Sequence, residues 1–166
     1  VLLNLVSIAA FGLDGFAHAA EALVGGAVGR RSRADLSGAV RASMRWAALI
    51  SLALAGLYAV AGGVLIDILS GIPEVRAAAR DYLPWVVAIP VISVWCYLYD
   101  GIFLGATRTH EMRNAAIATT LAYVGLLWLL LPLLGNHGLW LALALLNALR
   151  GLTLAAYYPR IAQSAG

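Results

Sequence analysis

The sequence contains no lysine and few charged residues of any kind. Charged residues make up 11% of the 166 residues, less than half of the about 25% found in soluble domains. Hydrophobic residues make up 63%. This composition excludes an ordinary soluble domain and predicts an integral protein of the lipid bilayer.

Cysteine is also scarce, and the motifs of common catalytic sites are absent. The single cysteine, Cys96, excludes an internal disulfide and a cysteine-based metal site. There is no Gly-x-Ser-x-Gly elbow, no His-Glu-x-x-His motif and no phosphate-binding loop. Asp14 and Asp100 together would suit an intramembrane aspartyl protease, but the Gly-x-Gly-Asp segment of such an enzyme is missing. We therefore predict a protein that is not an enzyme and holds no metal or organic cofactor.

Apolar segments of transmembrane length account for most of the chain. A helix needs about 20 residues to cross a bilayer. Five segments meet this length and predict an all-α membrane protein, with spans at about residues 1–29, 46–65, 82–106, 115–134 and 139–158. The chain starts at Val1, with neither an initiator methionine nor a signal peptide before the first span, so we expect a piece of a longer protein.

The arginines between the spans predict the orientation. Five of them lie between residues 30 and 45, which we expect to connect the first two spans, and others lie in the loop 108–113. Loops rich in arginine stay in the cytoplasm, so we expect the amino-terminal end outside and the carboxyl-terminal end inside the cell. We read the net charge of +3 as this topology signal and expect no nucleic-acid partner.

Proline and glycine predict the remaining boundaries. Pro73 followed by Glu74 is typical of the first turn of a helix, because the missing N–H and the negative charge both suit that position. We expect residues 135–138 to form a turn and Pro159 to end the last span.

The first span carries ionisable residues at helical spacing. Asp14, His18 and Glu21 lie at i, i+4 and i+7, which places them on one side of a helix. Such groups are costly in hydrocarbon, so this side must face protein or water, and we expect the other helices to pack around it. Asp14 and Glu21 are candidates for cation or proton coupling, whereas His18 is first a hydrogen-bonding partner between helices.

A second polar stripe lies on the third span. Helical spacing places Ser93, Tyr97, Asp100 and Thr107 on one face. Counting about 1.5 Å per residue from the arginine-rich ends places Glu21, Asp100 and Arg150 at one depth. Because an unpaired arginine is costly there, we predict that Arg150 pairs with Asp100, with Glu21 as the competitor. Asp100 is the third coupling candidate, and we place His18, Tyr97, Asn147 and Arg150 in the supporting polar network.

Several motifs resemble the multidrug and toxic compound extrusion (MATE) transporters, and most closely the branch named after DNA-damage-inducible protein F. The resemblance covers essentially the whole chain. Its motifs are LDGFAHAAEALVG at 13–25, PEV at 73–75, YL at 82–83, YDGIFLGATR at 99–108 and EMRN at 111–114.

The resemblance implies a twelve-helix, two-lobe antiporter that exports small organic cations or other amphipathic compounds in exchange for H⁺ or Na⁺. This chain would supply most of the carboxyl-terminal lobe, and its partner would be the missing amino-terminal lobe. Transport would then take place in the cell membrane, between the lobes. The alternative that we keep is a small self-contained membrane module, such as a channel or an assembly partner.

Overall fold

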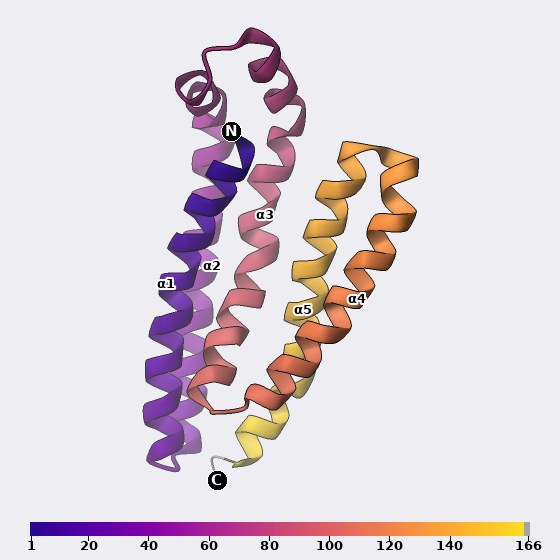
Figure 1. Cartoon of the computed structure of the whole chain (residues 1–166). Helices are drawn as coiled ribbons and strands as arrows, with labels where there is room; N and C mark the ends of the chain where they lie inside the picture. Colours follow the sequence, from indigo (N-terminus) through magenta and orange to yellow (C-terminus); the bar gives the residue numbers. More distant parts are fainter. Residues whose placement is uncertain (165–166) are drawn as a thin grey trace.

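The computed structural model describes residues 1–164 and consists there of five long helices. They run alternately up and down, so the amino terminus lies at one end of the bundle and the carboxyl-terminal helix finishes at the other (Figure 1). Their bounds are α1 (Leu2–Gly29), α2 (Arg33–Leu69), α3 (Pro73–Gly105), α4 (Thr109–Leu134) and α5 (Asn136–Ser164). All five are long and apolar enough to cross a membrane, as the sequence predicted.

The arginine-rich stretch after the first span is mostly helical, so most of the expected connection over residues 30–45 belongs to α2. Only residues 30–32 separate the two helices, and Arg31 there has a positive φ of 53°. The Ser32 side chain caps α2 by accepting a hydrogen bond from the backbone N–H of Asp35 at 3.2 Å. At about 1.5 Å per residue, the 37 residues of α2 are longer than the about 30 Å of hydrocarbon, so part of α2 extends beyond it.

At three further boundaries the helices are longer than the sequence predicted. Pro73 occupies the first turn of α3, as predicted, but the connection before it is only residues 70–72. The turn expected at 135–138 is confined to Gly135, whose φ is +55°, since α5 already begins at Asn136. Pro159 does not end α5, because the helix continues to Ser164. Beyond the bilayer, water can bond the carbonyl that a proline leaves free, so the helix is not forced to stop.

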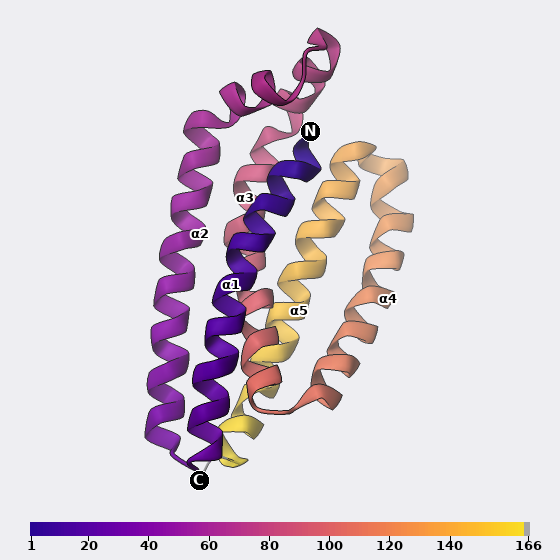
Figure 2. The ribbon, with the colours of Figure 1, turned by 60° about the vertical axis from the view of Figure 1, so that its left-hand side comes forward.

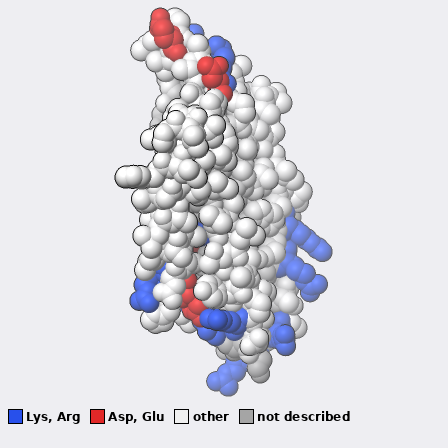
Figure 3. Space-filling view, turned by 90° about the vertical axis from the view of Figure 1, so that its right-hand side faces the viewer, with Lys and Arg blue, Asp and Glu red and all other residues white. Residues whose placement is uncertain are grey.

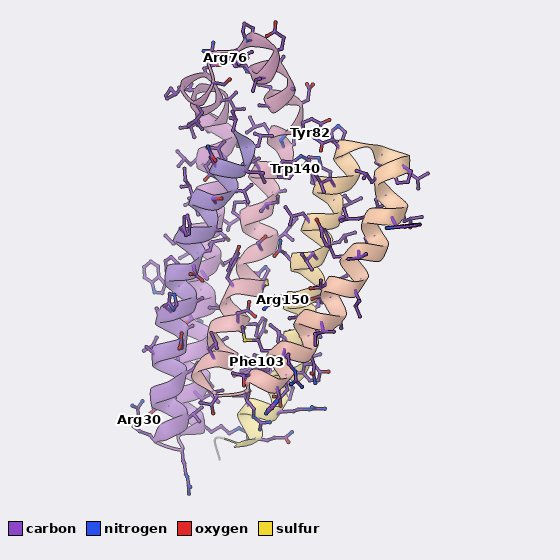
Figure 4. The ribbon with its side chains drawn as sticks, in the orientation of Figure 1. Arg30, Arg76, Tyr82, Phe103, Trp140 and Arg150 are labelled. Carbon is purple, nitrogen blue, oxygen red and sulfur yellow. The ribbon has the colours of Figure 1, made fainter. Side chains whose placement is uncertain are left out.

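Helix α3 is the centre of the bundle. It packs against α1, α2 and α5, whereas α4 packs mainly against α5 (Figure 2). One core cluster surrounds the buried Phe103 and the other surrounds Tyr58 and Trp140, nearer the opposite end (Figure 4). The Tyr58 hydroxyl donates to the backbone carbonyl of Leu5 at 2.7 Å, which ties α2 to α1.

Glycines of α3 bring it unusually close to α1. A Cβ atom on Gly101 would clash with the backbone carbonyl of Ala17, and one on Gly105 would clash with that of Glu21. Small residues at this spacing allow two membrane helices to pack backbone against backbone. The DGIFLG segment therefore fixes the position of α1 relative to α3.

Charge is distributed unequally between the two ends of the bundle. The end that carries Arg30, which we call the arginine end, holds eight of the eleven arginines against Asp35 and Glu111. Basic side chains gather there in Figure 3, while the long middle of that face is almost free of charge. At the other end, marked by Arg76 in Figure 4, Arg80 pairs with Asp67 at 2.7 Å. The uncharged middle includes exposed apolar side chains such as Trp128, as expected for contact with lipid.

Candidate polar site in the membrane

The ionisable residues of α1 form a connected row on its surface. The Nε2 atom of His18 lies 3.5 Å from an Asp14 carboxylate oxygen, and its Nδ1 lies 3.4 Å from a Glu21 oxygen. The exposed fractions of these side chains are 51% for Asp14, 71% for His18 and 42% for Glu21. The row is therefore assembled as predicted, with His18 between the two carboxylates.

The prediction that the other helices pack around this row is wrong. The buried face of α1 is a different one, made of small and apolar residues: Leu5, Ala9, Leu13, Ala17, Ala20, Val24 and Ala27. The physical reason is the backbone contact with Gly101 and Gly105, which needs a smooth face of small side chains. Within residues 1–164, the acidic face of α1 is left uncovered.

The second polar cluster joins α3 to α5. An Nη2 atom of Arg150 lies 3.0 Å from one oxygen of Asp100 and 3.1 Å from the other, and Nε lies 3.3 Å from the latter. About a quarter of each side chain is exposed, and Figure 4 shows Arg150 between the two helices. The predicted partner is therefore confirmed, and Glu21, the competitor, contacts His18 instead.

Two other predicted members of the polar network, Tyr97 and Asn147, lie about one turn before Asp100 on α3 and Arg150 on α5. Tyr97 lines the same cavity as Leu13, the neighbour of Asp14 on α1. Asn147 lies one turn before Arg150 on α5, and its amide N–H donates to the Leu143 carbonyl at 3.1 Å. Thr107 does not belong to the stripe, because α3 ends at Gly105 and Thr107 lies in the connection with a φ of 57°.

Two contacts were missed by the sequence reasoning. The Cys96 thiol lies 4.0 Å from an Asp100 oxygen, one turn away on the same helix, a contact that the i, i+4 spacing could have indicated. Toward the end opposite the arginine end, the Trp85 indole N–H donates to Nδ1 of His137 at 3.0 Å, and Tyr82 packs on the same imidazole. This contact ties the start of α5 to α3, and no sequence spacing signals it.

Comparison with known proteins identifies the family. The sequence model of the MatE family matches residues 1–131. The chain belongs to the MatE family. Members of this family are membrane transporters and not enzymes, so the prediction of a non-catalytic protein is confirmed.

One curated relative shows how much of a MatE protein the chain represents. The chain is 46% identical over 160 residues to DNA damage-inducible protein F of Escherichia coli (strain K12). The match covers 96% of this chain but 35% of the relative, so the chain spans about a third of the length of that MatE protein. No solved structure matches the chain. Across residues 1–164, no group of three or more His, Cys, Asp or Glu side chains is arranged to hold a metal ion.

Proposed function

We propose that this chain forms most of the carboxyl-terminal lobe of a MatE antiporter that exports organic cations or other amphipathic compounds. The exchanged ion is H⁺ or Na⁺. Family membership and five membrane-spanning helices support this proposal.

The observation that carries the proposal is the uncovered acidic face of α1. Asp14, His18 and Glu21 lie on a helix of membrane-spanning length, yet about half or more of the Asp14 and His18 side chains is exposed. Ionisable groups at this depth cannot face lipid cheaply, at about 2.5–3.5 kcal/mol each. The acidic face of α1 must therefore contact protein or a water-filled path. In our proposal, the amino-terminal lobe and the transport pathway lie against this face.

The two clusters divide the carboxylates by role. Asp100 is neutralised by the Arg150 guanidinium, so it is the structural member. Asp14 and Glu21 have only His18 between them and no arginine partner in residues 1–164. These two carboxylates are therefore the groups that take up and release the coupling ion as the lobes move.

The distribution of arginine sets the proposed orientation, with the arginine end in the cytoplasm. Cysteines placed singly at Ser70 and Asn136, in a background where Cys96 is serine, should react with an impermeant thiol reagent added outside intact cells. Cysteines at Ser32 and His110 should not react. The opposite labelling pattern would overturn the orientation.

The transport activity is tested with the complete transporter that contains this chain. Reconstituted in proteoliposomes, it should export an organic cation when a proton gradient or a sodium gradient is imposed, each in a separate experiment. A protein that responds to neither gradient is not an antiporter of this kind. Residues 1–166 expressed alone should confer no drug resistance, because the acidic face of α1 then lacks its cover. Resistance from that segment alone would favour the self-contained module.

A further inference from the structure

A cavity of about 130 Å³ lies where α1, α3 and α5 meet. Its α3 wall contains Pro90, Ser93 and Tyr97, and its α5 wall contains Asn147. Leu13, the neighbour of Asp14 in α1, closes the third side. The cavity therefore lies beside the carboxylates described above but is not part of either ion-pair cluster.

The Ser93 hydroxyl is the unusual group in this cavity. Ser93 is 3% exposed, and its oxygen has no hydrogen-bond partner among the described residues. The hydroxyls of Thr119 and Thr153, by contrast, donate to the backbone carbonyl one turn earlier, at 2.8 and 2.7 Å. Leaving a buried hydroxyl without a hydrogen bond is destabilising, so such groups normally have a partner, which can be water.

Further hydrogen-bonding groups converge on the same space. The Asn147 amide uses its N–H on the Leu143 carbonyl, which leaves its own carbonyl oxygen without a partner in the described part of the chain. The Tyr97 hydroxyl makes no hydrogen bond there either. Pro90 has no N–H to give to the Val86 carbonyl, so the backbone ladder is also interrupted at this wall.

We propose that this cavity binds ordered water, held by Ser93, Tyr97 and Asn147. A buried water needs two to four polar partners and a share of about 30 Å³, so the cavity has room for about four molecules. Tyr97 lies one turn before Asp100 on α3, and Leu13 directly precedes Asp14 on α1, so the bound water continues the polar path toward both carboxylates. Its use as the proton supply of Asp14 rests on the proposed antiport function, whereas the water site itself does not.

The test is hydroxyl-radical labelling of the complete transporter by brief X-ray irradiation in H₂¹⁸O. The radical reacts close to the water that forms it, so labelling of Tyr97 reports water held beside it. Tyr58 is the internal reference, because it is 2% exposed and its hydroxyl is bonded to Leu5. We expect Tyr97 to be labelled at least about fivefold faster than Tyr58 in the unmodified transporter.

Two substitutions should dry the cavity, and one should not. Ser93→Val and Asn147→Leu each replace a polar partner by an apolar group and should lower Tyr97 labelling at least threefold. Ser43→Ala is the matched control, since the Ser43 hydroxyl is also buried without a partner in the described part of the chain but does not line this cavity. Ser93→Ala tests the site with the least effect on packing if Ser93→Val fails to fold.

Two results would overturn the water site. One is Tyr97 labelling no faster than that of Tyr58, and the other is equal labelling in the unmodified transporter, Ser93→Ala and Asn147→Leu. Proton-driven export measured in parallel separates the two proposals. Loss of labelling without loss of proton-driven export would remove the cavity from the proton path, whereas absence of any gradient-driven export would refute only the antiport function.

Discussion

Removing one charge of the Asp100–Arg150 pair should destabilise the transporter far more than removing both. In Arg150→Met the carboxylate of Asp100 loses contacts of 3.0–3.3 Å and remains between α3 and α5, and no other cation of residues 1–164 contacts it. Breaking such a pair by deleting one partner costs about 3–5 kcal/mol. Because about a quarter of each side chain is exposed, we expect the lower part of that range, about 3 kcal/mol.

The double variant Arg150→Met with Asp100→Asn strands no charge and nearly conserves volume. We expect its free energy of unfolding to lie within about 1 kcal/mol of that of the unmodified transporter, because neutral replacement of a buried ion pair is often tolerated. The assay is a double-mutant cycle on the complete transporter, with free energies of unfolding from titration in mixed micelles of SDS and a mild detergent. Additive effects of Arg150→Met and Asp100→Asn, with no recovery in the double variant, would refute the pairing argument.

Two further predictions concern packing between helices. Gly101→Ala should lower the free energy of unfolding by about 1–3 kcal/mol, because the added Cβ meets the Ala17 carbonyl and pushes α1 away from α3. Gly125→Ala on α4 is the control, because its Cβ meets nothing within 4 Å and should not destabilise the protein. Thermal unfolding of both variants in detergent is the check, and equal melting temperatures would contradict the close approach of α1 and α3. His137→Ala should free the start of α5 from α3, so hydrogen exchange around residues 134–140 should rise, and Trp85→Phe should reproduce part of the rise because it removes only the 3.0 Å hydrogen bond. Unchanged hydrogen exchange in His137→Ala would show that the contact between Trp85 and His137 does not stabilise the start of α5.

The membrane spans were predictable because hydropathy and length decide them. The ends of the helices were less predictable than the spans, since a helix that has left the bilayer can continue in water. The Ser32 cap lets α2 start at Arg33, and α5 continues through Pro159, although both stretches looked like boundaries in the sequence. A proline breaks one backbone hydrogen bond, and near the membrane surface water can replace it.

The members of the polar site were predictable, but their surroundings were not. Asp100 and Arg150 pair because depth along their helices is set by the 1.5 Å rise, which the sequence contains. The side of α1 that faces α3 depends on where Gly101 and Gly105 allow contact, and this is a property of two helices together. Helical periodicity identifies a polar face of α1 without telling which neighbour covers it.

The central claim is that Asp14 and Glu21 on α1 carry the coupling ion, and gradient-driven export by neutral variants tests it most directly. Asp14→Asn and Glu21→Gln in the complete transporter, reconstituted at equal protein amounts, should each keep normal expression and lose export driven by an imposed proton or sodium gradient. Asp35→Asn is the matched control, since that carboxylate pairs with Arg30 at the arginine end and should leave export unchanged. Normal pH-dependent export in both Asp14→Asn and Glu21→Gln would contradict the account and remove α1 from the coupling mechanism.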